Sequence, residues 1–289
     1  MAGLALAKPV PGRTGMGRFV SRHPTVIGGG ALLLAICVMS IAAPLLGTVD
    51  PIMINPTYRL RDPSFEAWFG TDRFGRDLYS RVIYGGRISL IVGFSVAALS
   101  TVIGLTIGLL SGFIRVLDTV VMRVMDGMMA IPAIMLAIAL IALSKASVTI
   151  VIIAVTIPEV PRVVRLVRSV VLTIREQPFI EAATAIGTTM PRILWRHLLP
   201  NALPPLIVQA TYICASAVLI EAALSFLGAG TPPEVPSWGN IMAEARPYFQ
   251  LKPWMVLLPG LFLAITVLAI NLVGDGLRDM LDPRLARRM

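Results

Sequence analysis

The sequence predicts an all-α polytopic membrane protein with six transmembrane helices. Of its 289 residues, 56% are hydrophobic and only 14% are charged, whereas soluble domains carry about 25% charged residues. A spanning helix needs about 20 mostly apolar residues to cross about 30 Å of hydrocarbon, and several segments meet that requirement. The net charge of +9 fits a membrane protein with basic cytoplasmic loops. No nucleic-acid-binding signature accompanies this positive charge. We therefore expect the chain to interact with the lipid bilayer and not with nucleic acid.

Six apolar segments follow one another along the chain. They cover residues 26–46, 88–112, 122–144, 147–163, 203–227 and 254–275. The third contains Pro132, and the fourth is short and ends in Pro158 and Pro161. Such prolines either mark a transport pathway or leave carbonyls that neighbouring residues satisfy. The first segment also has the basic leader of a signal peptide, but its length and its extended leader favour a retained span.

The distribution of basic residues predicts that both termini are cytoplasmic. With the N-terminus inside, 16 of the 25 basic residues lie on inner segments, and short loops carry this signal. The predicted organisation is a cytoplasmic segment (1–25), a first transmembrane helix (26–46), an external loop (47–87), a core transmembrane domain (88–275) with a cytoplasmic loop (164–202), and a cytoplasmic tail (276–289). In the external loop, Thr71 or Asp72 is expected to cap a short helix, with Asp77 and Arg81 paired one turn apart.

The cytoplasmic loop contains the most informative local pattern of the chain. Pro178 fits the first turn of a helix, and Glu181 follows near the positive end of the helix dipole. Gly187 ends or bends this helix, and Pro200 is expected to stop a second short helix. One apolar stripe is formed by residues at helical spacing, namely Phe179, Ala182, Ala183, Ile186 and Met190. The helix either docks into a groove of a soluble partner or lies on the bilayer or on its own bundle.

Acidic residues inside the apolar segments are few. Glu221 is the only acid deep in a span, where a charge costs roughly 2.5–3.5 kcal/mol. It is therefore protonated, paired or facing a wet pathway; its small neighbours favour a hydrogen bond to another helix over a role as a gate. Asp126, Glu159 and Asp275 lie near inner span ends, where pairing with arginines is expected.

No catalytic, cofactor or metal site is expected. The phosphate-binding pattern GxxxxGK[ST] is absent, so any ATP use must occur on another chain. His23, His197, Cys37 and Cys214 lack metal-ligand spacing. An intramembrane enzyme would need a base beside a nucleophilic serine, and a secondary transporter would need several mid-membrane ionisable groups, whereas only Glu221 is present.

Several motifs carry a family resemblance. Glu181-Ala182-Ala183, Gly187 and Leu199-Pro200 resemble the EAA loop of permease subunits of ABC importers, with His197 where the general pattern has Ile, as in peptide and nickel permeases. Other matches are similar to the C-type subunit of dipeptide and oligopeptide permeases, so the resemblance spans about residues 65–285. They are Phe69-Gly70-Thr71-Asp72, Gly75-Arg76-Asp77, Arg87-Ile88-Ser89-Leu90, Leu224-Ser225-Phe226-Leu227-Gly228, Ser237-Trp238-Gly239-Asn240, Gly274-Asp275-Gly276-Leu277-Arg278-Asp279 and Leu281-Asp282-Pro283-Arg284.

The resemblance implies a type I ABC importer permease in the bacterial inner membrane, forming half of a pathway for short peptides. Its implied partners are a second homologous permease subunit in a heterodimer, two ATP-binding subunits and an extracytoplasmic substrate-binding protein. The helix at 178–187 would be the coupling helix, with Ala182, Ala183 and Gly187 allowing close seating and Glu181 anchoring it. Leu199 and Pro200 complete the coupling motif. Nickel or glutathione remains an alternative cargo.

Overall fold

The computed structural model describes residues 24–281, and this part of the chain is helical apart from turns and one isolated bridge between Thr71 and Asp77. The helices are α2 (Pro24–Ile41), α3 (Leu78–Phe113), α4 (Arg115–Met129), α5 (Ala133–Ala142), α6 (Val148–Arg175), α7 (Pro178–Ala185), α8 (Met190–Ile193), α9 (Leu199–Phe226), α10 (Trp238–Ala245) and α11 (Trp254–Leu281). Short turns are η1 (Ala43–Leu45), η2 (Pro56–Tyr58) and η4 (Arg246–Tyr248), and a π-helical turn, η3 (Leu194–Leu198), joins α8 to α9. The expected all-α class is confirmed. Most of the predicted segment 1–25 and of the predicted tail 276–289 lies outside the described residues.

Four helical segments of the described chain are long and apolar enough to cross a membrane: α2, α3, the run from α8 through α9, and α11. A fifth candidate is the pair α4 and α5, whose axes are bent by 87°. The helix α6 is long, but three arginines and a glutamate lie within its middle turns. The multi-pass architecture is therefore confirmed, and residues 24–281 contain four or five candidate spans of the six that were expected.

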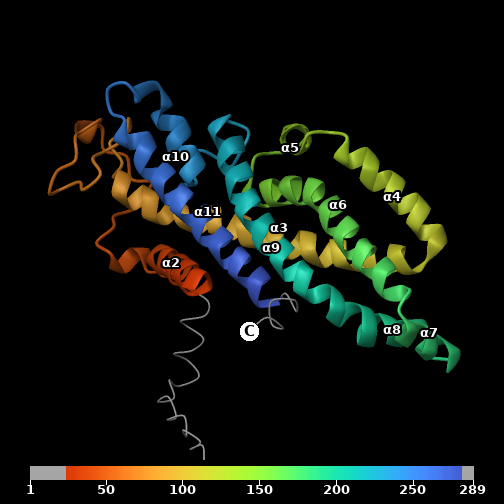
Figure 1. The fold of residues 1–289 in the computed structure, drawn as a ribbon. Helices are drawn as coiled ribbons and strands as arrows, with labels where there is room; N and C mark the ends of the chain where they lie inside the picture. The colour runs from red at the N-terminus through yellow and green to blue at the C-terminus, as the bar shows by residue number, and fades with distance from the viewer. Residues whose placement is uncertain (1–23, 282–289) are drawn as a thin grey trace, which may run out of the picture.

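The helix α3 lies at the centre of the bundle and packs along α6, α9 and α2 (Figure 1). Its Gly104, Gly108 and Gly112 recur every fourth residue and face α6. A Cβ atom on Gly108 would lie 2.7 Å from the Cβ atom of Val167, and one on Gly112 would lie 2.8 Å from that of Val171. Small residues at this spacing let two helix backbones approach closely. We call this contact the glycine seam; no larger side chain fits in it.

The helix α6 continues past the prolines that were expected to end it near residue 163. Pro158 and Pro161 both lie inside the helix, which ends at Arg175. A proline in a helix interior costs about 3 kcal/mol relative to alanine, but Val163 and Val167 are buried against the core on the turns that follow. This packing outweighs the local preference, so the helix does not end near residue 163 as expected.

The expected third span, 122–144, is broken rather than continuous. The helix α4 ends at Met129, α5 starts at Ala133, and the two meet at 87°. Pro132 lacks an N–H group and disfavours helical geometry at the residue before it. The chain therefore turns at Pro132, and α5 packs against α6 and α9.

The N-terminal end of α3 also differs from expectation. Asp77 caps the helix by accepting a hydrogen bond of 2.8 Å from the Ser80 N–H, so α3 starts ten residues before the expected second span and neither Thr71 nor Asp72 caps it. Arg81 does not pair with Asp77 but with Asp72 and Glu244, at 2.5 and 2.6 Å. The pairing expected from one-turn spacing was wrong because Asp77 is engaged by backbone and side chain of Ser80.

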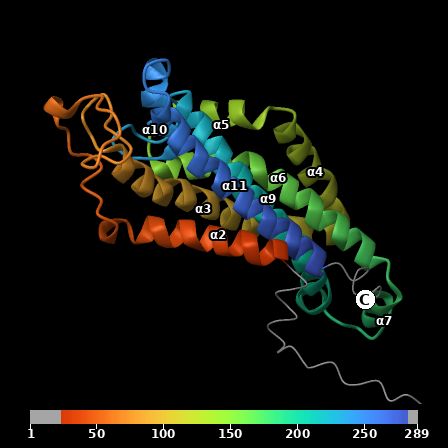
Figure 2. The same cartoon turned by 60° about the vertical axis from the view of Figure 1, so that its left-hand side comes forward.

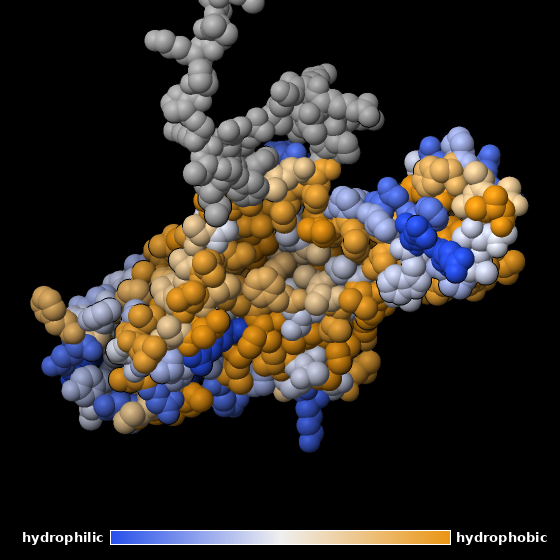
Figure 3. Space-filling model, turned by 90° about the horizontal axis from the view of Figure 1, so that it is seen from below, coloured by the Kyte–Doolittle hydropathy of each residue, from blue (hydrophilic) through white to orange (hydrophobic). Residues whose placement is uncertain are grey.

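The surface of the molecule agrees with membrane insertion. Hydrophobic residues cover most of the middle of the face in Figure 3, and hydrophilic residues gather towards its two ends. An apolar band between polar ends is typical of a membrane protein.

Candidate functional site

The short helix α7 directly follows α6, at the end of the molecule farthest from α10 (Figure 2). Pro178 occupies its first turn, and Glu181 also lies there with an exposed side chain. Ile180 is buried in the main core of the protein. The predicted helix at 178–187 is therefore present, and one buried isoleucine on α7 holds it to the body of the chain.

The apolar stripe expected on α7 is divided between two sides of the helix. Ala183 is buried against the chain itself, whereas Ala182 is exposed and Ile186 is 83% exposed. Phe179 is about half exposed, and its ring centroid lies 6.0 Å from that of His197. The expected stripe therefore does not form one exposed face, because Ala183 shares the inward side of this short helix with Ile180.

Gly187 ends α7 through a specific backbone arrangement. Its φ angle is +81°, a region that glycine enters without steric cost. The Gly187 N–H donates to the Thr184 carbonyl at 2.9 Å, and the Thr188 N–H donates to the Ala183 carbonyl at 3.0 Å. These two bonds form a Schellman motif. The prediction that Gly187 terminates this helix is confirmed.

The second short helix is not stopped at Pro200. The helical run passes from α8 through the π-helical turn into α9, where Leu199 and Pro200 form the first turn. The Leu199 N–H donates to the carbonyl of Leu194, five residues earlier. Pro200 is tolerated here because a proline in the first turn of a helix needs no N–H donor of its own. The π-helical turn connects α8 to this first turn, so the helical run continues. Ile193 and Leu198 are buried and anchor this run.

A shallow depression of about 520 Å³ lies beside α7. It is lined by residues from three helices and their ends: Phe113, Arg175, Ile180, Glu181, Thr184 and Ala185. Arg175 is held there by a 3.3 Å hydrogen bond to the Gly112 carbonyl. Among the residues that the structure describes, Glu181 forms no ion pair. The surface thus presents a carboxylate, small residues and exposed apolar groups at one end of the bundle.

Glu221 lies on α9 and is completely buried. It accepts hydrogen bonds from Ser89 of α3 at 3.1 Å and from Ser225 at 2.8 Å. The Ser225 hydroxyl continues to Thr231, whose hydroxyl contacts Ser237 at 3.3 Å. The side chain therefore bonds to a neighbouring helix, as the structural interpretation expected, and ties α9 to α3 and to the start of α10. Its part in transport stays a prediction.

Three other acids were expected to pair with arginines. Glu159 accepts hydrogen bonds of 3.1 Å from Arg162, and Asp126 pairs with Arg165 at 2.6 Å. Asp275 forms no ion pair within residues 24–281, and its pairing stays a prediction. A pair that the sequence did not indicate joins Asp118 to Arg168, and the arginines of α6 thus hold α4 in place.

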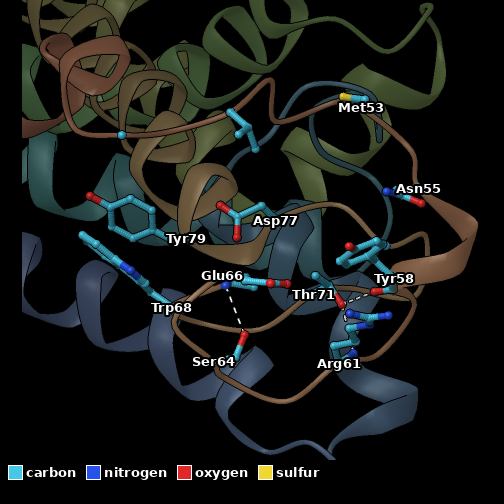
Figure 4. Close-up of a pocket in the computed structure, with 14 residues that line it drawn as sticks. Met53, Asn55, Tyr58, Arg61, Ser64, Glu66, Trp68, Thr71, Asp77 and Tyr79 are labelled. Carbon is cyan, nitrogen blue, oxygen red and sulfur yellow. Dashed lines mark hydrogen bonds between the residues drawn. The ribbon is translucent and has the colours of Figure 1, made fainter.

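The loop before α3 folds around a pocket of about 300 Å³ at the other end of the bundle (Figure 4). Tyr58, Trp68 and Tyr79 line it, and the Arg61 guanidinium carbon lies 3.8 Å from the centre of the Tyr58 ring. The hydroxyl of Thr71 donates to the Tyr58 carbonyl, which closes one wall.

Next to this pocket lies a buried ion-pair cluster that sequence reasoning missed. Arg76 and Arg81 both pair with Asp72 and with Glu244 of α10. The spacing of Asp72 and Arg76 was the only available signal, because Glu244 lies far away in the sequence. The cluster fixes the loop before α3 to α10.

Within residues 24–281, no group of three or more His, Cys, Asp or Glu side chains is arranged to hold a metal ion.

The chain is similar to known transport proteins. A family model described as "Binding-protein-dependent transport system inner membrane component" matches residues 100–287. Over 271 residues it is 52% identical to a Sinorhizobium fredii protein named "Probable peptide ABC transporter permease protein y4tQ", covering 94% of this chain and 93% of that one. It is 43% identical to a dipeptide transport system permease protein of Alkalihalophilus pseudofirmus, covering 92% and 88% of the two chains.

The fold is similar to that of solved transporters as well. A chain of the inward-facing MetNI methionine ABC transporter superposes with a TM-score of 0.57 at 23% identity, covering 71% of this chain and 98% of that chain. At this identity the likeness concerns the fold alone, and it agrees with the expected type I permease fold.

Proposed function

Because the chain belongs to the family of binding-protein-dependent transport system inner membrane components, we propose that it forms half of the translocation pathway of an ATP-driven importer of short peptides. The cargo is inferred from the similar proteins, which are named as peptide and dipeptide permeases. The partners are a second permease subunit, two ATP-binding subunits and an extracytoplasmic substrate-binding protein. The proposed orientation has both termini and α7 on the cytoplasmic side.

The observation that carries this proposal is the exposed helix α7 at the end of α6. It offers Glu181 and Ala182 on its outer side and ends at Gly187. Helix-in-groove binding needs a short helix whose exposed side is small enough to seat closely. In this arrangement Glu181 anchors the helix by polar contacts, and Ala183 supports it from below.

Energy enters through α7 when ATP draws the two ATP-binding subunits together. Because α7 follows α6 after two residues, displacement of α7 moves α6 and switches the passage between its inward- and outward-facing forms. Leu199 and Pro200 fix the far side of the coupling loop at the start of α9.

Charge reversal at Glu181 tests the proposal. We expect Glu181→Lys to abolish ATP-dependent uptake of a labelled dipeptide while the subunit still inserts and assembles. The matched control is Glu176→Lys, which makes the same charge change at an exposed residue that precedes α7. Uptake by Glu181→Lys at the level of the control would contradict the proposed coupling role.

The same uptake assay distinguishes the cargoes. Unlabelled dipeptide, nickel and glutathione are added in turn as competitors. Only the competitor that is the true cargo should reduce the uptake of the labelled dipeptide. Uptake driven by a proton gradient without ATP would indicate a secondary transporter and would overturn the proposal.

A further inference from the structure

The junction between α4 and α5, residues 130–132, interrupts the helical backbone beside the middle of α6. Met125 of α4 is buried against Val160 and Val164 of α6, and α4 ends one turn later. The helices α4 and α5 together form one candidate span, so the junction between them falls inside the hydrocarbon core, which is about 30 Å thick.

Several backbone carbonyls at the junction have no hydrogen-bond donor. Pro132 has no N–H group, and the Ile131 N–H donates to Met128 at 3.4 Å rather than to Gly127. Within residues 24–281, no backbone or side-chain donor reaches the carbonyls of Gly127, Met129, Ala130 or Ile131. The chain surface is also open here, since Ile131 is 46% exposed and Pro132 is exposed.

Unpaired backbone groups at membrane depth cannot face lipid, because each costs several kcal/mol in hydrocarbon. An apolar helix of another subunit would supply no donors either. Water or a polar solute satisfies these carbonyls, so the junction belongs to a wet passage.

The side chains around the junction fit a solute of variable shape. Met129 and Met135 are exposed, the latter by 66%, and Met128 lies next to them. Methionine is flexible and polarizable and adapts to different partners, and methionine-rich surfaces bind without strict selection.

We propose that the junction at residues 130–132 lines the translocation passage and is a contact site for peptides in transit. Its free carbonyls accept hydrogen bonds from the amino terminus and the backbone N–H groups of the peptide. Met129 and Met135 contact the peptide side chains without selecting among them. This inference rests on the proposed import of peptides.

Cysteine labelling in the complete, reconstituted transporter tests the inference. Cys37 and Cys214 are first replaced by alanine, and Ile131→Cys is treated with a charged, membrane-impermeant methanethiosulfonate. The control is Val102→Cys on α3, which is 63% exposed and lies at similar depth, because neighbouring Gly104 packs on Val160 and Val163. A thiol reacts as the thiolate, which forms in water, so labelling should be about tenfold faster at residue 131 than at residue 102. A saturating dipeptide should slow it.

The outcomes separate the inference from the proposed function. If the unlabelled transporter imports the dipeptide but Ile131→Cys reacts no faster than Val102→Cys in any nucleotide state, the inference is wrong. If Ile131→Cys is labelled rapidly but the transporter neither imports the dipeptide nor is protected by it, the passage stands and the peptide cargo is wrong.

Charge at Met135 gives a second readout. Met135→Lys should lower the uptake of lysine-containing dipeptides relative to acidic ones, and Met135→Glu should shift the ratio in the opposite direction, each by about tenfold for one close charge contact. Equal uptake ratios in both variants would exclude contact between residue 135 and the peptide.

Discussion

Gly187 offers a direct test of how the end of α7 serves coupling. A Cβ atom at this position would meet no atom of the described chain within 4 Å. A substitution therefore creates no clash within the subunit, and its cost comes from the backbone angle of +81°. An L-residue in the left-handed region costs roughly 1–2 kcal/mol, whereas asparagine enters it more readily.

This cost acts on the two hydrogen bonds that close the helix, of 2.9 and 3.0 Å. A loss of 1–2 kcal/mol corresponds to a change of about five- to thirtyfold in the ratio of the capped to the opened helix end. Gly187→Ala should therefore weaken coupling clearly, Gly187→Val should weaken it further because valine is β-branched, and Gly187→Asn should retain most of it.

The assay is dipeptide uptake per ATP hydrolysed in proteoliposomes containing the complete transporter. Assembly with the ATP-binding subunits is measured in parallel, so that loss of docking is distinguished from loss of coupling. If Gly187→Asn fails as badly as Gly187→Val, the glycine is required for close approach to a partner and the argument from backbone strain is refuted.

Three further predictions concern the packing around the passage. Arg81→Met should destabilise the N-terminal end of α3 by up to about 3–5 kcal/mol, because it leaves two buried carboxylates, Asp72 and Glu244, with Arg76 as their one remaining partner. Thermal unfolding in detergent should show a clear drop in the unfolding temperature, while Asp62→Asn at an exposed pair should change it little. Gly108→Leu should overfill the glycine seam at a cost of about 1–3 kcal/mol and reduce assembly of the subunit. Adding Val167→Ala to this variant should restore part of the assembly. If it does not, the packing argument is contradicted. Glu221→Gln should leave dipeptide transport nearly unchanged, since an amide oxygen still accepts a hydroxyl hydrogen bond; a large loss of uptake would indicate a role in the pathway instead.

Local sequence signals predicted the start and the end of α7 well. Pro178, Glu181 and Gly187 act within one or two helical turns of themselves, so the start and the end of α7 followed from the chain alone. The same local logic failed for Pro158 and Pro200. Both lie where burial of neighbouring side chains or a π-helical turn decides whether the helix continues, and the sequence does not reveal this.

Contacts between distant segments were the part that the sequence could not supply. Glu221 was expected to bond to another helix, but nothing in the chain singled out Ser89 as its partner. Likewise, Arg81 was assigned to the acid one turn away, whereas Glu244 and Asp72 hold it in the fold. Spacing in the sequence identifies only ion-pair partners that are near in the chain. The packing of α10 against α3 brings Glu244, a partner distant in sequence, next to Arg81.

The helix α6 links the sites described above. It is continuous from Val148 to Arg175, and the glycine seam holds it so closely to α3 that the two helices cannot slide past each other without steric overlap. In the proposed mechanism, displacement of α7 would therefore move α6 and α3 together. The same helix carries Arg165 and Arg168, which hold α4 through its two aspartates. We therefore expect the displacement to reach α4 and the junction at residues 130–132, where the helical backbone is interrupted.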